Sequence, residues 1–356
     1  MSAQTTPPRP GFVAELRDAV TVRAALLVLG VLLLQLGFIA SYLGAFHDPA
    51  PRRIPVAVVA PSGAHAGAAT QIVAELNQLD GRPLAARLAA DEPAARRLIE
   101  RRTVYGALVL GPARSDHLLV AGAAGASAAQ ALTAILGQVD QVRRRTLTVE
   151  DVRPAAAGDA RGLSGFYLVV GWVVGGYLVA AILGIGGGAR PANRHRAVLR
   201  LAVLAAYAVA SGIGGALIAE TLLAALSGHF LSLWALGALL VFAVGAFTMA
   251  AQVLLGTIGI GVAILLFVVL GNPSAGGAYP SVLLPPFWAA IGRWLPPGAG
   301  TDAVRNIVYF PKSSVAQPLL VLAGYAVVGL LVTVGVAGRT PAESRTGTAP
   351  AGARGG

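Results

Sequence analysis

The feature of this sequence that most constrains its fold is a stretch of 72 residues, 221–292, without a single Asp, Glu, Lys or Arg. A second uncharged stretch, 24–46, has 23 residues, and at a helical rise of about 1.5 Å per residue it would cross a hydrocarbon core of about 30 Å. Only 12% of all residues are charged, against about 25% in soluble domains. So few charges cannot cover a water-facing surface, and the sequence predicts a helical protein that crosses a membrane several times.

The positions of the apolar runs predict six membrane-spanning helices. The 72-residue stretch must hold two of them, divided at a turn near Gln252 and Gly256. The first span could instead be a cleaved signal peptide, but its length and the lack of a clean cleavage site before His47 favour a retained anchor. The predicted spans are 24–46, 163–189, 201–219, 231–251, 254–270 and 313–338.

Basic residues border these runs in a pattern that predicts topology. Arg9, Arg17 and Arg23 precede the first span, and a basic loop at 190–200 follows the second. Because short basic loops stay in the cytoplasm, both termini are predicted to be cytoplasmic in a multi-pass protein of the plasma membrane. Segment 1–23 is then a cytoplasmic arm and 339–356 a disordered cytoplasmic tail. Membrane topology thus explains the net charge of +11, and nucleic acid is not an expected partner.

Residues 47–161 form the one soluble-looking stretch, between the first two spans. Strands are predicted at 54–60, 104–110 and 117–121, and helices at 66–79, 93–102 and 128–145. Strands that alternate with helices indicate a small α/β domain. The predicted fold is therefore an all-α polytopic membrane bundle of six transmembrane helices, with an inserted extracytoplasmic α/β domain between helices 1 and 2. Five of the six helices lie in 162–338.

Motifs for catalysis are weak or missing. The chain has no cysteine, its single lysine, Lys312, lacks the glycine-rich turn of a P-loop, and its histidines show no metal-ligand spacing. Ser115, Asp116 and His117 are consecutive, so along a strand they would point in different directions and could not form a triad. We therefore expect no enzymatic activity, no cofactor and no bound metal.

Glu220 is the single acid flanked on both sides by apolar sequence. An acid inside the membrane would be a candidate proton or substrate site that faces the bundle interior. The alternative is a position at the membrane interface. The interface is favoured because Glu220 lies about twenty residues, roughly one bilayer of helix, from the inner basic loop.

The most specific pattern lies in a proline-rich segment, 272–317. It reads GNPSAGG from Gly271, LPPFW from Leu284, LPPGAG from Leu295 and RNIVYF from Arg305. This pattern resembles the region before the last span in the type-2 ABC exporter permease superfamily, especially its phage-infection-protein-like and nitrosoguanidine-resistance-like branches, which include actinobacterial-type membrane proteins of unknown function. The layout of one span, a large outside domain and five further spans is similar too.

The resemblance implies a permease-like half-transporter in the lipid bilayer, with a homodimer as its assembly. It would move hydrophobic, lipid-linked or drug-like molecules outward with a separate ATP-hydrolysing subunit supplied in trans. The alternative is a non-transporting cell-envelope protein whose extracytoplasmic domain binds a partner or a phage. Candidate ATPase-docking residues are Phe12, Arg17, Arg194 and Arg196.

The proline-rich segment is also the candidate outer gate. Gly271 and Pro273 are expected to end the fifth helix, and the later prolines to break the segment into short interfacial helices. Arg305 is expected to pair with phosphate headgroups or a nearby carboxylate, or else to reach the interface by snorkelling. The candidate gate residues are Gly271, Asn272, Pro273, Pro285, Phe287, Pro296, Gly298, Arg305, Tyr309 and Phe310.

Overall fold

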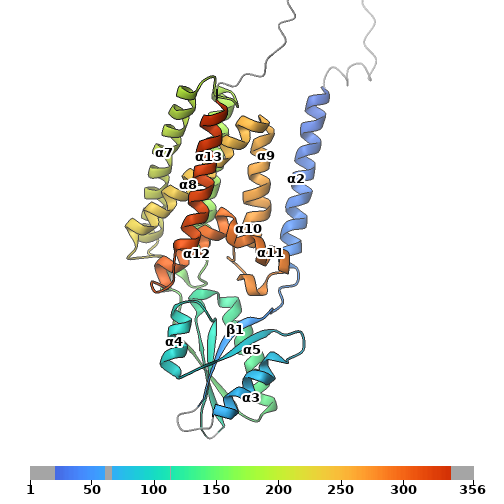
Figure 1. Ribbon diagram of the computed structural model, residues 1–356, viewed down its shortest axis with the longest axis vertical. Helices are drawn as coiled ribbons and strands as arrows, with labels where there is room; N and C mark the ends of the chain where they lie inside the picture. Colours follow the sequence, from blue (N-terminus) through green and yellow to red (C-terminus); the bar gives the residue numbers. More distant parts are fainter. Residues whose placement is uncertain (1–20, 61–65, 113, 338–356) are drawn as a thin grey trace, which may run out of the picture.

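The computed structural model describes residues 21–60, 66–112 and 114–337. A bundle of long helices forms one end of the molecule and a small α/β domain forms the other (Figure 1). Five helical segments among the described residues are long and apolar enough to cross a membrane. They are α2 (Val22–Phe46), α6 (Ser164–Gly187), α7 (Arg194–Ala216) with its π-helical extension η3 (Leu217–Leu222), α8 (Phe230–Leu255) and α13 (Ala316–Val336).

The predicted fifth span is shorter than these five. It comprises α9 (Ile258–Ile264), the π-helical η4 (Leu265–Leu270) and α10 (Gly271–Ser274). The apolar segment 258–274 therefore has 17 residues, which at about 1.5 Å per residue spans about 25 Å, less than a hydrocarbon core of about 30 Å. The described residues thus hold five membrane-capable helices and one shorter apolar helix.

This helix ends at Ser274, directly after Pro273 and three residues after Gly271, the two residues that were predicted to end it. Proline has no N–H, so Pro273 leaves the carbonyl of Val269 without its usual helical donor. The Ser41 hydroxyl of α2 donates to that carbonyl instead. A donor from a neighbouring helix thus lets the chain stay helical through the proline.

The prolines after this helix do divide the following segment into short helices, as predicted. Pro286 opens α11, and Pro296 and Pro297 open α12, positions at which a missing N–H costs nothing. The helices are η5 (Ser281–Leu283), α11 (Pro286–Ile291), η6 (Gly292–Trp294) and α12 (Pro296–Tyr309).

The α/β domain is built on one five-stranded mixed sheet with strand order β2-β1-β3-β4-β5. Only the β3–β4 pair is antiparallel among the described strands. The strands are β1 (Ile54–Val59), β2 (Leu84–Ala89), β3 (Gly106–Leu110), β4 (Ser115–Val120) and β5 (Thr146–Asp151). The helices are α3 (Ala66–Asn77), α4 (Glu92–Glu100), α5 (Ala126–Val142), η1 (Gly122–Ala124) and η2 (Ala157–Asp159).

The predicted α/β character of this domain is confirmed, and each predicted strand and helix is present within a few residues. The sequence prediction missed β2 and β5, which are the two edge strands. Both carry exposed charged residues, Arg87 in β2 and Asp151 in β5. Edge strands bury less apolar surface than central strands, so their sequences carry a weaker strand pattern.

Helices cover both faces of the sheet (Figure 1). On one face, Ile54, Val56 and Val58 pack with residues of α3 and α5. On the other face, Ala57 and Val59 pack with Ile99 of α4 and with Phe310, which directly follows α12. Phe310 is buried in that cluster, so the end of α12 contributes to the hydrophobic core of the α/β domain.

Candidate functional site

Helix α12 is one of the elements that join the bundle to the α/β domain. Most of its side chains are buried, and it contacts α6, α8, α10 and α13. A β-carbon at Gly271 would lie 2.7 Å from the Pro297 ring, and one at Gly298 would collide with the carbonyl of Gly292. Glycine at both positions therefore lets α10, η6 and α12 pack with their backbones in contact.

Arg102 of the α/β domain reaches directly onto α12. It donates hydrogen bonds to Asp302 Oδ1 at 2.9 Å and to Asn306 Oδ1 at 2.6 Å, and its guanidinium lies 5.7 Å from the centroid of the Phe310 ring. Asn306 in turn donates to the carbonyl of Ser314 at 2.9 Å, just before α13. One arginine thus connects the domain to the start of the last span.

Arg305 is buried beside this contact, with 6% of its surface exposed. Its Nη2 donates to the carbonyl of Gly276 at 3.1 Å, and its Nη1 lies 3.7 Å from Asp302 Oδ1. The pairing with a nearby carboxylate matches one of the predicted alternatives. The alternative prediction, that the Arg305 side chain snorkels to the membrane interface, is wrong because protein encloses the guanidinium. A charge taken out of water in this way needs compensation from partners, and Asp302 supplies it to Arg102 and Arg305 together.

A second contact involves the single lysine of the chain. Lys312 Nζ donates to Glu100 Oε2 at 2.6 Å, and Arg153 Nη2 donates to Glu100 Oε1 at 3.3 Å. These contacts, with the Lys312 hydrogen bond the largest, lower the pKa of Glu100. The Ser313 hydroxyl also donates to the carbonyl of Glu100 at 3.3 Å, so the end of α4 is fixed to the loop between α12 and α13.

A third contact uses Tyr309, the last residue of α12. Its hydroxyl donates to Asp159 Oδ2 at 2.7 Å, while Asp159 Oδ1 accepts from the backbone N–H of Ser164 at 2.8 Å. Asp159 is buried, and Ser164 is the first residue of α6. Tyr309 therefore links α12 to the point where the chain leaves the domain and enters the bundle.

We call the group Glu100, Arg102, Asp159, Asp302, Arg305, Asn306, Tyr309 and Lys312 the polar junction. Of its members the sequence analysis named only Arg305 and Tyr309 as site residues. Asp302, Arg305 and Asn306 stand at helical spacing in an otherwise apolar segment, and this spacing predicts a shared polar face. The partners Arg102 and Asp159 are more than 140 residues away in the sequence, and no local pattern could reveal them.

The other candidate gate residues are divided between two places. Gly271, Pro296 and Gly298 lie with Arg305 around α12. Pro285 directly precedes α11, and Phe287 lies on α11 with 57% of its surface exposed. Asn272 is buried in α10. The structure therefore gathers most of the predicted gate around α12 but directs the Phe287 ring outward.

An apolar groove of about 690 Å³ opens on the side of the bundle. It runs along α13 and reaches α8, η4 and η6. Near one end the Gln317 amide donates to the carbonyl of Arg293 at 2.9 Å, and the Arg293 guanidinium lies 5.1 Å from the Trp294 ring. The groove is lined by Phe247, Leu266, Trp294, Gln317, Leu320, Val321, Gly324, Tyr325 and Val328.

Glu220 lies in η3, where α7 ends. Its Oε1 accepts the backbone N–H of His229 at 2.9 Å and also that of Gly228. The carboxylate thus caps the turn that leads into α8. Its other oxygen, Oε2, is buried and accepts no hydrogen bond from the described residues, so the interfacial position and the intramembrane alternative both stay predictions.

The candidate ATPase-docking residues Arg194 and Arg196 are exposed at the start of α7. Asn193 caps this helix by accepting the N–H of Arg196 at 2.9 Å. Arg190 donates to the carbonyl of Val253 at 2.9 Å and so ties this loop to the end of α8, at the end of the bundle opposite the α/β domain (Figure 1). Phe12 and Arg17 lie outside the described residues.

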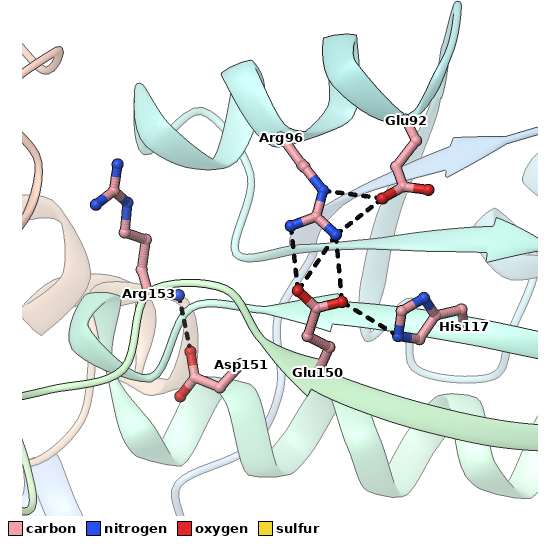
Figure 2. Close-up of polar contacts among 6 residues, drawn as sticks. All are labelled: Glu92, Arg96, His117, Glu150, Asp151 and Arg153. Atoms are coloured by element: carbon pink, nitrogen blue, oxygen red, sulfur yellow. Dashed lines mark hydrogen bonds and ion pairs between the residues drawn. The ribbon is translucent and has the colours of Figure 1, made fainter.

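Figure 2 shows a separate ion-pair cluster on the sheet of the α/β domain. Arg96 lies between Glu92 at 2.8 Å and Glu150 at 3.2 Å, and His117 Nε2 lies 3.5 Å from Glu150. Asp116, the neighbour of His117 in β4, is buried and pairs with Arg145. Asp116 and His117 therefore engage different partners, as predicted from their consecutive positions.

Comparisons with protein-family models, with curated proteins and with solved structures find no match for this chain.

Proposed function

We propose that this chain is the membrane subunit of a type-2 ABC exporter, which moves hydrophobic, lipid-linked or drug-like molecules outward with an ATPase supplied in trans. The observation that carries the proposal is the interrupted segment 258–309, whose short helices lie at the bundle end next to the α/β domain (Figure 1) and whose last helix, α12, holds the buried Arg305. Membrane proteins tolerate broken helices at depth where protein or a cavity surrounds them, and transporters build their substrate paths from such helices.

The proposal treats the shorter segment 258–274 as the fifth of six spans. It is supported by the course of the chain, because α9 starts beside the end of α8, far from the α/β domain, and α10 lies close to α11 and α12 (Figure 1). With six spans both termini lie on the same side of the membrane. The basic loop 190–200 lies at the bundle end opposite the domain, so the positive-inside rule makes that side the cytoplasm and the plasma membrane the location.

The proposed docking side for the ATPase is this basic end of the bundle, with Arg194 and Arg196 exposed on it. The proposed entry for a hydrophobic substrate is the apolar groove along α13, which an apolar molecule could enter from the bilayer without crossing water. A homodimer would place two such bundles side by side, as the resemblance implies.

The experiment is an affinity purification of the tagged full chain from mild detergent, with ATP hydrolysis as the readout. We expect an ATP-hydrolysing subunit to co-purify with the wild-type chain and to be largely lost with the Arg194→Gln/Arg196→Gln variant. The matched control, Arg97→Gln/Arg101→Gln, removes two exposed charges from the α/β domain and should retain the subunit.

Two outcomes would contradict the proposal. ATP hydrolysis by the purified chain alone would show that it is not a partner-dependent subunit. Recovery of the chain only with itself or with envelope proteins would favour the alternative function, a non-transporting envelope protein whose α/β domain binds a partner or a phage.

A further inference from the structure

The open edge of the sheet in the α/β domain carries a pocket of about 450 Å³ that the proposed transport function does not use. Its apolar floor comes from the starts of β1 and β2, and three arginines surround it. The lining residues are Arg53, Pro55, Asn77, Arg82, Leu84, Ala85, Ala86, Arg87 and Thr103.

The three arginines are not neutralised by the protein. No ion pair among the described residues involves Arg53, Arg82 or Arg87. Arg87 Nη2 donates to the carbonyl of Thr103 at 3.3 Å, a contact that holds the side chain across the pocket and leaves its other N–H groups available. Elsewhere in this domain arginines such as Arg96, Arg145 and Arg153 do pair with carboxylates, so the three pocket arginines differ from their neighbours.

The backbone brings two of these arginines together. Arg53 and Arg82 both have left-handed conformations, with φ of 51° and 48°, and the N–H of Arg53 donates to the carbonyl of Arg82 at 3.1 Å. A non-glycine residue adopts this conformation only at a free-energy cost. The fold of the domain therefore holds the backbones of both arginines next to each other beside the pocket.

The pocket does not fit an added peptide strand. The side chain of Asn77 occupies the edge of β2, because its Nδ2 donates to the carbonyl of Ala86 at 3.0 Å and its Oδ1 accepts the Ala86 N–H at 2.8 Å. An incoming strand needs these backbone groups. Recognition at this pocket thus falls to the guanidinium groups.

The pocket lies on the side of the domain that faces the bundle. Arg52, which precedes Arg53, donates its N–H to the carbonyl of Val282 in η5 at 2.8 Å, and Arg102, which precedes Thr103, pairs with Asp302 of α12. Arg52 and Arg102, each the chain neighbour of a lining residue, thus contact the segment between the fifth and sixth predicted spans. In the topology of the proposed function, on which this step rests, the lipid headgroups of the leaflet on this side of the membrane would lie in the same zone.

We propose that this pocket binds a phosphate group, carried either by an anionic phospholipid of the adjacent leaflet or by a soluble phosphorylated compound. Guanidinium groups bind phosphate through paired, charge-assisted hydrogen bonds. Three unpaired guanidiniums match a group with one or two negative charges, and the apolar floor accommodates the carbon atoms attached to the phosphate.

The test uses the full chain in mild detergent with two probes. In one arm, native mass spectrometry measures the phosphatidylglycerol retained relative to phosphatidylcholine. In the other, calorimetry measures the binding of inorganic pyrophosphate. The variant is Arg82→Gln/Arg87→Gln, and the matched control is Arg97→Gln/Arg101→Gln, which removes the same charge from exposed positions outside the pocket.

We expect the pocket variant to retain roughly tenfold less phosphatidylglycerol, or to bind pyrophosphate roughly tenfold more weakly, because it loses two charge-assisted contacts. The control variant should match wild type in both measurements. A loss confined to phosphatidylglycerol identifies the lipid as the source of the phosphate, and a loss confined to pyrophosphate identifies a soluble ligand. If the double variant does not fold, Arg87→Gln alone, on the exposed edge strand, should give a smaller loss in the same arm. The proposal is overturned if pocket and control variants behave alike in both arms.

Discussion

The α/β domain packs large aliphatic side chains and one fully buried carboxylate, whereas the central helix of the bundle packs many small residues against its neighbours. In the domain, Asp116 is completely buried and forms two hydrogen bonds of 2.6 Å with Arg145. In the bundle, the central helix α8 buries alanine, glycine and valine against α6, α7 and α13. A water-facing domain gains its stability by removing apolar surface from water. Helices surrounded by lipid gain little in this way and depend on close packing through small residues.

The largest expected effect comes from breaking the buried ion pair in the domain. Arg145→Met leaves the carboxylate of Asp116 buried without its charged partner, and such a loss costs about 3–5 kcal/mol. Arg145 also donates to the carbonyl of Gly111 at 2.8 Å, so the turn between β3 and β4 loses a contact too. We expect a clear fall in the melting temperature of the domain, measured by circular dichroism of the full chain.

The matched control for this pair is the double variant Asp116→Asn/Arg145→Met, which removes both charges. Its melting temperature should recover toward wild type, because the main cost of the single change is the unpaired charge. Equal destabilisation by the single and double variants would show that the charge of Asp116 is not what matters.

The next effect concerns Asp140 of α5, which lies near the same pair. Burial, and then the Asp116 carboxylate, raise the pKa of Asp140 to about 6, while Arg143 and Arg145 oppose the shift. Neither oxygen of its carboxylate accepts a hydrogen bond from the described residues. Because the folded chain holds this proton more tightly than the unfolded chain, Asp140 favours folding below about pH 4 and loses that contribution as the pH rises to about 6.

Asp140→Asn removes the titrating carboxyl, and with it the loss of folding stability as the pH rises to about 6. At about pH 7.5 the variant should be more stable than wild type by about 2 kcal/mol, and the difference should shrink toward zero below about pH 4. Chemical denaturation of the full chain at a series of pH values measures this. A constant difference across the series would mean that Asp140 does not titrate in this range.

The third effect tests close packing in the bundle. A β-carbon at Gly329 of α13 would collide with the backbone of Ala246 and Phe247 in α8, so Gly329→Ala should cost roughly 1–3 kcal/mol through overpacking. Gly335, on the same helix, has nothing within 4 Å of that position. Gly335→Ala should leave stability unchanged or raise it slightly. Thermal denaturation in detergent compares the two, and equal effects would contradict helix contact through Gly329.

The sequence predicted the bundle better than it predicted the polar junction. A long uncharged run is a direct sign of a helix that can cross a membrane. The sequence therefore predicted both ends of α2, α6, α8 and α13 to within a few residues. The fifth predicted span is less regular because its continuation through Pro273 depends on a hydroxyl of α2, a tertiary contact that local sequence does not encode.

The glycines and prolines of the proline-rich segment were easier to identify than their distant partners for a related reason. Glycine and proline restrict the backbone locally, so Gly298 and Pro296 could be identified from the sequence alone, whereas Arg102 and Asp159 act on α12 from the α/β domain. The two regions of the molecule thus meet at residues that only the fold brings together.

The polar junction fixes the α/β domain to α12 and to the loop after it, and we therefore expect the domain and α12 to move as one unit. The chain has no cysteine, and spin labels can therefore be placed selectively. Arg97→Cys lies on α4, and Leu231→Cys at the start of α8, where the side chain is 70% exposed.

The most direct test is the distance distribution between these two labels, measured by pulsed electron paramagnetic resonance in lipid nanodiscs. We predict one narrow distribution in the otherwise wild-type chain and in the control Arg101→Gln. In the variant Arg102→Gln/Lys312→Gln, which removes the hydrogen bonds of both charges to their carboxylate partners, we predict a broad distribution. A distribution as narrow in this variant as in the control would contradict the claim that the polar junction holds the domain in place.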